Sequence, residues 1–325
     1  MQVKEGPEEA SPAGIRSRRR ANLGDILFKA VVAVFGLSVL LLAAMMLWQL
    51  LFESRHSIST FGWGFLTGRE WNPVSRTFGA APAIYGTVVS SVIAVVFAVP
   101  ISLGAAIYLS EMAPPWLRHP ASFLVESLAA IPSVVFGLWG IYVLVPWIRN
   151  PVEKVLGDHL GFLPLFSGPP FGVGMLAAGI ILAIMILPII TAIARDSLMA
   201  VPLSQREAML ALGATKWEMI SRAVLQYCRS GLVGAVLLGL GRALGETMAV
   251  TMVIGKTYDI NTSLFAPAST AASQIASEFS EASFSLYTSA LMELALILLG
   301  ITLIVNVVAR LLVWRIARSP ESIRE

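Results

Sequence analysis

Six long apolar segments run through this sequence, and they restrict the folds that are available to the chain. An α-helix rises about 1.5 Å per residue, so each segment can cross a hydrocarbon core of about 30 Å. Only 13% of the residues are charged, whereas soluble chains carry roughly 25%. We therefore expect an all-α integral membrane protein of about six transmembrane helices. The expected helices lie near residues 26–52, 84–109, 122–147, 172–194, 230–255 and 284–312.

The polar stretches predict how the chain is organised around the membrane. Residues 1–22 are polar and rich in Glu, Pro and Arg, which is typical of a disordered tail. Residues 23–315 are expected to form the transmembrane domain, followed by a second tail at 316–325. With the N-terminus inside, sixteen of the 23 Lys and Arg residues lie on the inner side and six on the outer side, with Arg242 inside a helix. The positive-inside rule then predicts that both termini are cytoplasmic.

Several classes of function are disfavoured by the residues that are present. The three histidines are scattered and share no ligand spacing, so we expect no metal site. The uneven distribution of the basic residues along the chain indicates membrane topology and not nucleic-acid binding. Gly255-Lys256-Thr257 resembles the end of a P-loop, but Val250 stands where its first glycine should be. We expect no catalytic site and no ATP hydrolysis by this chain.

The outer loop at 53–81 is rich in aromatic residues, among them Phe61, Trp63, Phe65 and Trp71. The favoured interpretation is a belt of aromatic side chains at the membrane interface. The alternative is a docking surface for an extracytoplasmic partner.

Prolines interrupt three of the apolar segments. A proline in a membrane helix usually causes a kink, because neighbouring groups satisfy the freed backbone atoms. For Pro132, with Ser133 beside it, a gate in a transport path is the alternative interpretation.

The longest inner loop, residues 195–229, predicts two short helices. Ser204-Gln205-Arg206-Glu207 has the form of a capping box, and Thr215-Lys216-Trp217-Glu218 has the form of a second one. Gly213 can adopt the left-handed conformation that ends the first helix. A hinged helix pair on the inner face is suited to being held and moved by a partner.

Part of this loop resembles the EAA loop of ABC importer permeases, which docks on the ATPase subunit and transmits its closure. The resemblance rests on Glu207-Ala208-Met209, on Gly213 six residues after the glutamate, and on Leu225. Methionine replaces the third residue of that motif, and Ala223 and Gln226 replace its usual Ile and Pro. The resemblance implies that the ATPase contacts are made by Glu207, Ala208, Gly213, Lys216 and Trp217. For Glu207, helix capping alone is the competing interpretation.

Arg242 and Glu246 are ionisable residues inside an apolar segment. Such residues are costly at membrane depth, and they tend to face a water-filled path or a partner charge. Their spacing of four residues places them on one face of a helix. They are therefore either a structural ion pair or part of a substrate path. Gly241 and Gly245, at GxxxG spacing, indicate close helix packing.

The sequence is similar to phosphate transport system permease proteins of the PstC type over about residues 60–315. The similarity rests on the segment from Gly241 to Val250, on Glu126–Gly137, and on Trp71-Asn72-Pro73. It implies an ABC importer permease bundle of the MetI type in a bacterial cytoplasmic membrane, which moves phosphate by alternating access. It also implies a second related permease subunit, two ATPase subunits that bind ATP and Mg²⁺, and an extracytoplasmic phosphate-binding protein.

Other functions remain open at this level. An ABC permease for sulfate or molybdate would differ only in its solute. A secondary transporter would need no ATPase, although the capped inner helix pair argues against it. A membrane-anchored assembly protein would carry no solute at all.

Overall fold

Residues 23–317 are described by a computed structural model, and their regular elements are all helical. Within this range the only β-structure consists of two isolated bridges, Asn72–Thr77 and Gly255–Ala268. The all-α fold expected from the apolar segments is therefore confirmed. The tail expected at 1–22 lies outside the described residues, as does most of the tail expected at 316–325.

The contacts divide the chain into a unit that ends at Gln49 and a unit that begins at Leu50. The first unit is built from the helix α1 (Leu23–Glu53), which continues a few residues into the second. Helix α1 is apolar on all sides, and its side chains up to Gln49 are almost all exposed. A helix of this length and composition suits a lipid environment.

Four long helices form the core of the second unit: α4 (Ala81–Ile107), α9 (Met175–Met199), α13 (Arg229–Gly245) and α16 (Ser285–Ala317). Helix α4 continues as the π-helical turn η1 (Tyr108–Met112). A Cβ atom on Gly179 of α9 would lie 2.3 Å from a methyl group of Ile93 on α4, so the absence of a side chain allows these helices to approach closely. Within residues 23–317, five helices are long and apolar enough to cross a membrane, or six when one bent pair counts as a span.

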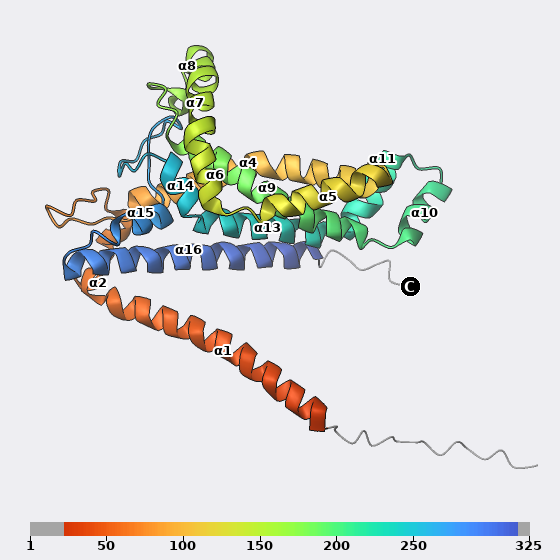
Figure 1. Ribbon diagram of the computed structural model, residues 1–325, viewed down its shortest axis with the longest axis horizontal. Helices are drawn as coiled ribbons and strands as arrows, with labels where there is room; N and C mark the ends of the chain where they lie inside the picture. The colour runs from red at the N-terminus through yellow and green to blue at the C-terminus, as the bar shows by residue number, and fades with distance from the viewer. Residues whose placement is uncertain (1–22, 318–325) are drawn as a thin grey trace, which may run out of the picture. The chain divides into compact units, whose positions relative to one another are not determined.

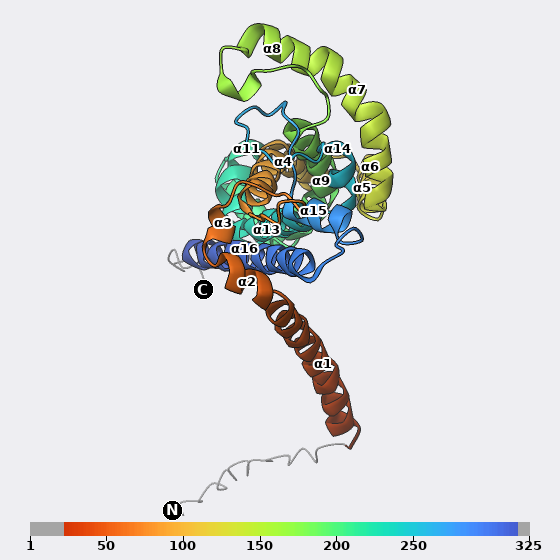
Figure 2. The same cartoon turned by 90° about the vertical axis from the view of Figure 1, so that its left-hand side faces the viewer.

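The helix expected at 122–147 is not continuous, and this expectation was wrong. Helix α5 (Pro115–Ala129) ends before Pro132, and a new helical run starts at Ser133. Proline lacks an N–H and disfavours the helical conformation of the residue before it, which explains the break. The run consists of α6 (Ser133–Trp139), η2 (Gly140–Leu144), α7 (Val145–Trp147), η3 (Ile148–Glu153) and α8 (Lys154–Leu160). Figures 1 and 2 show α6, α7 and α8 turning away from α5.

The helix expected at 230–255 is also broken. Helix α13 ends at Gly245, Glu246 is extended, and α14 covers Met248–Val253. Glycines at 241 and 245 weaken the helical tendency at this point, since glycine loses the most backbone freedom on folding. The inner loop before α13 contains α10 (Leu203–Ala211), α11 (Lys216–Met219), η5 (Ile220–Val224) and α12 (Leu225–Tyr227). The run 216–227 meets α13 at an angle of 71°.

The aromatic residues of the outer loop form a second core instead of a belt. Phe65 and Trp71 are buried, and Trp71 packs edge-on against Phe78 with ring centroids 4.9 Å apart. The belt interpretation was therefore wrong for these residues, while Trp63 is 86% exposed. The elements that enclose this core are α2 (Arg55–Phe61), α3 (Gly64–Thr67), α15 (Ala271–Glu278) and the start of α16.

One buried carboxylate holds this outer core together. Glu278 accepts hydrogen bonds from Trp71 Nε1 at 2.6 Å and from the Tyr287 hydroxyl at 2.7 Å. The Tyr258 hydroxyl donates to its other oxygen. Burial, and then the hydrogen bond to Glu278, raise the pKa of Tyr258 above its ordinary value. Tyr258 therefore remains a hydrogen-bond donor at physiological pH. The Glu278 carboxylate thus joins segments that are far apart in the sequence.

Candidate functional site

Arg242 lies on an open face of α13. Arg242 is exposed, as are Leu238 one turn before it and Met248 at the start of α14. Among residues 23–317, no carboxylate lies within ion-pair distance of Arg242. The side chain is therefore available to an anion or to another subunit.

The depth of Arg242 in the bundle can be read from the packing of α13 on α9. A Cβ on Gly231 would meet Ser197, and a Cβ on Gly239 would meet Ile190, so the two helices run in opposite directions. Arg242 then lies near the level of Ile186, close to the middle of α9 (Met175–Met199). An unpaired arginine near the middle of a membrane bundle is a candidate for a solute path.

Glu246 does not form the ion pair that its spacing suggests. Helix α13 ends at Gly245, and Glu246 has an extended backbone with φ −70° and ψ 128°. The i, i+4 geometry requires an unbroken helix, so the break removes it. The structural ion pair, which was one of the two interpretations of Arg242 and Glu246, is absent from the described part of the chain.

The break at Glu246 lies beside the start of another broken helix. Gly137 of α6 packs on Ala249 of α14, and Gly140 packs on Val253, so the two segments run side by side in the same direction. Each begins directly after a break. Pro132 and Ser133 therefore start a helix that is the parallel neighbour of the one following Glu246. The structure thus brings the path and gate candidates onto adjacent elements.

Close packing occurs at a glycine other than the two in the GxxxG motif. A Cβ placed on Gly241 or on Gly245 would have no described atom of another element within 4 Å. Gly239, by contrast, packs tightly on Ile190. The expectation of close packing at Gly241 and Gly245 is therefore not met among residues 23–317.

The inner loop forms the two helices that were expected, but only one capping box. Thr215 Oγ1 accepts from the Glu218 N–H at 3.3 Å, and Glu218 accepts from the Thr215 N–H at 2.9 Å. The box expected at Ser204 and Glu207 was wrong, because α10 already begins at Leu203 after Pro202. Gly213 has φ +83°, the left-handed conformation expected of it.

The candidate ATPase-contact residues lie together on this loop. Glu207, Ala208, Gly213, Lys216 and Trp217 are all exposed, and Trp217 is 68% exposed. Within the described range, the Glu207 side chain forms no hydrogen bond and no ion pair. The loop adjoins the start of α13, whereas Arg242 is near its other end, so the two groups of candidate residues are separated along one helix (Figure 1).

Two ion pairs near the loop at 195–229 could not be predicted from the sequence. Arg206 of α10 pairs with Glu111 at 2.8 Å, and Arg195 of α9 pairs with Glu126 of α5 at 2.9 Å. The partners are 95 and 69 residues apart. No helical spacing connects positions so distant, so only the tertiary structure reveals them.

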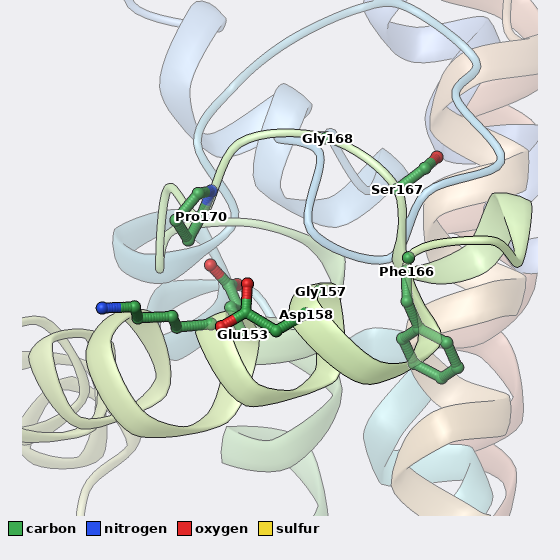
Figure 3. A pocket seen from close by; sticks show the side chains of 9 residues that line it. Glu153, Gly157, Asp158, Phe166, Ser167, Gly168 and Pro170 are labelled. Carbon is green, nitrogen blue, oxygen red and sulfur yellow. The ribbon is translucent and has the colours of Figure 1, made fainter.

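A cavity of about 400 Å³ lies between α8 and the loop that follows it (Figure 3). It is lined by Glu153, Asp158 and Lys154 beside the short turn η4 (Pro164–Phe166). Glu153 is 1% exposed, and one of its oxygens accepts from the Gly172 N–H at 2.8 Å. Two carboxylates and one ammonium give an acidic lining, which does not suit an anionic solute.

The chain matches a known family over most of its length. The model of the binding-protein-dependent transport system inner membrane component matches residues 98–318. The phosphate transport system permease protein PstC of Pasteurella multocida is 47% identical over 306 residues, which are 93% of this chain and 95% of the relative. The protein of that name from Mesorhizobium japonicum is 46% identical over 317 residues, covering 95% of this chain and 97% of the relative.

Solved structures share the fold at low sequence identity. A chain of the bacterial alginate ABC transporter, in complex with an alginate pentasaccharide-bound periplasmic protein, aligns with a TM-score of 0.59 at 16% identity. The alignment covers 90% of this chain and 99% of that chain. A chain of the inward-facing MetNI methionine ABC transporter aligns with a TM-score of 0.54 at 18% identity, covering 72% and 94%.

The curated relatives match almost end to end, and the family model covers well over half of the residues. The solved structures agree with the all-α membrane fold. The chain therefore belongs to the family of binding-protein-dependent transport system inner membrane components, among the phosphate transport system permeases of the PstC type.

Proposed function

We propose that this chain is a permease subunit of an ATP-driven importer that moves inorganic phosphate across a bacterial cytoplasmic membrane. The observation that carries the proposal is Arg242, which lies exposed near the middle of the bundle without a partner carboxylate in the described chain. The PstC-type relatives, which are phosphate permeases by name, support the choice of solute.

Arg242 binds the passing phosphate in this proposal. A guanidinium is planar, holds two oxygens of an oxyanion at once, and cannot lose its charge at any physiological pH. Glu246 follows the end of α13 on the same path, and its negative charge repels the anion. The breaks before α6 and α14 allow the segments around Pro132 and Ser133 to act as the gate.

ATP is hydrolysed by two partner ATPase subunits, and this chain binds neither ATP nor a metal. The exposed residues of the inner loop, from Glu207 to Trp217, dock on one ATPase and move with it. The open face of α13 is directed toward a second, related permease subunit, so that the path lies between two chains. An extracytoplasmic phosphate-binding protein delivers the solute to the outer side, and both termini of this chain are cytoplasmic.

Reconstitution of the full complex in proteoliposomes tests the proposal. We expect uptake of labelled phosphate that requires ATP and the phosphate-loaded binding protein, together with stimulated ATP hydrolysis. Uptake without ATP would instead indicate a secondary transporter. Competition by sulfate or molybdate at equal concentration would indicate a permease for another oxyanion, and the absence of any flux would end the proposal.

A further inference from the structure

Arg206, in the first turns of α10, joins the inner loop to the ends of two membrane helices. Its Nη2 donates to Glu111 Oε1 at 2.8 Å and to the Leu198 carbonyl at 2.8 Å. Glu111 belongs to η1, the π-helical end of α4, and Leu198 belongs to the last turn of α9. Nη1 donates to the Val201 carbonyl, which follows α9. One side chain therefore connects α10 with both α4 and α9.

This ion pair is shielded from water. The Glu111 side chain is 6% exposed and the Arg206 side chain 15% exposed. The neighbouring pair of Arg195 and Glu126 differs, because the Glu126 side chain is 55% exposed. A charge pair in a low-dielectric site is much less weakened by water and salt than one at the surface. The Arg206–Glu111 link is therefore the more persistent of the two.

A second arginine holds the same turn of α4 from another side. Arg118 of α5 donates from Nη2 to the Ser110 carbonyl at 2.9 Å. The turn η1 is thus tied to α5 through Arg118 and to α10 through Arg206. Cys228 lies buried at the bend between α12 and α13. The inner ends of the membrane helices converge at this point.

Apart from Arg206, helix α10 packs mainly on η5 and α11 of the same loop, and little on α4 or α9. None of its residues is fully buried, and only Met209 among its apolar residues packs partly on the core. Helix α9 is already joined to α10 by the short linker at 200–202, whereas α4 is distant from α10 in the sequence. A movement of α10 would therefore reach α4 mainly through Arg206.

We propose that Arg206 and Glu111 are positioning residues that transmit the ATPase-driven movement of α10 to α4. The inference rests on the proposed function, because it assumes that an ATPase moves the loop. It adds a specific route, in which the guanidinium of Arg206 makes α10, η1 and the end of α9 move as one unit.

The experiment uses the complete complex with the double substitution Arg206→Met and Glu111→Gln. Removing both charges together leaves no lone buried charge, so assembly and thermal stability are expected to be near those of the wild type. The matched control is Arg195→Met with Glu126→Gln, which makes the same two changes at the pair with the exposed carboxylate. Phosphate taken up per ATP hydrolysed is measured in proteoliposomes.

We expect the link variant to lose about tenfold in phosphate taken up per ATP, a typical size for coupling between sites. ATP hydrolysis without binding protein should be unchanged, and the control should remain within about twofold of the wild type. A normal ratio in a stable link variant would overturn the inference. Absence of phosphate uptake by the wild type would instead contradict the proposed function.

A distance measurement tests the link whatever the solute is. Nitroxide labels at positions 112 and 212, both exposed and in a Cys228→Ser background, report the separation of η1 from the end of α10. On ATP binding this separation should stay constant with the link intact and change in the double variant. An equal change in both proteins would show that α10 and α4 do not move as one unit.

Discussion

Few charged groups lie inside the apolar bundle, and Arg242 of α13 is one of them. Arg242 is exposed in this chain, and a water-lined path would lower the cost of its lone charge. The alternative, a stabilising pair with Glu246, requires a helix that the break after Gly245 removes. The geometry therefore favours the path interpretation that the sequence alone left open.

Replacing Arg242 with Gln is expected to lower phosphate uptake about 30-fold or more, because an anion loses a charged, hydrogen-bonding partner. Assembly should remain near normal. Arg242→Lys should restore only part of the uptake, since an ammonium keeps the charge without the planar fork. Uptake is measured in proteoliposomes, and recovery in the double variant Arg242→Gln with Glu246→Gln would contradict a role in the path.

Tyr258→Phe tests the outer core at the level of one hydroxyl. Removing a donor to a buried carboxylate is expected to lower the free energy of unfolding by about 2 kcal/mol. Tyr85→Phe is the matched control, because the Tyr85 hydroxyl bonds the Asn261 carbonyl at an exposed site and its loss should cost less. Thermal unfolding of the purified complex measures the stability of both variants. An equal loss of stability in the two would show that Glu278 does not organise this core.

At the scale of elements, local chemistry predicted some features and missed others. The capping box at Thr215 and Glu218 and the left-handed Gly213 follow from neighbouring residues, and sequence reasoning found both. The box at Ser204 failed because the N-cap of α10 is Pro202, two residues earlier. The breaks at Pro132 and Glu246 were missed because apolar periodicity does not register a short extended segment.

Gly213 separates the two helices of the inner loop with φ +83°. Gly213→Pro should leave membrane insertion intact but uncouple ATP hydrolysis from uptake, because proline fixes φ near −65° and removes an N–H. The Gly213 N–H currently bonds the Leu210 carbonyl at 3.0 Å. Gly213→Asn is the control and should retain coupling, since asparagine tolerates the left-handed conformation. Equal coupling in both variants would argue against a structural role for this turn.

Helix α4 offers a test of packing with two glycines. A Cβ on Gly86 would lie 2.0 Å from the Ser269 backbone carbonyl oxygen, whereas a Cβ on Gly104 would lie more than 4 Å from every described atom outside its own helix backbone and its chain neighbours. Gly86→Ala should lower the free energy of unfolding by about 1–3 kcal/mol, because backbone cannot easily move aside. Gly104→Ala should be neutral or slightly stabilising. A thermal shift assay compares them, and equal stability would mean that α4 does not approach Ser269 so closely.

For the whole molecule, hydropathy was enough to predict the all-α membrane fold. It could not show that Phe65 and Trp71 enter a core, because aromatic residues suit both an interface and an interior. Nor could it pair Arg206 with Glu111, whose approach depends on how α4, α9 and α10 are arranged. Fold class thus follows from composition along the chain, whereas the links between elements follow only from packing.

The orientation of the whole chain gives the last prediction. In a Cys228→Ser background, a cysteine that replaces Trp63 should react with an impermeant thiol reagent added outside intact cells. A cysteine that replaces Lys216 should react only after the membrane is opened, because the basic residues favour an inner location for that loop. Both positions are exposed, so a lack of reaction reports sidedness and not burial. Phe65 would be unsuitable, since its side chain is fully buried. The reverse labelling pattern would invert the topology and place the inner loop where no ATPase could reach it.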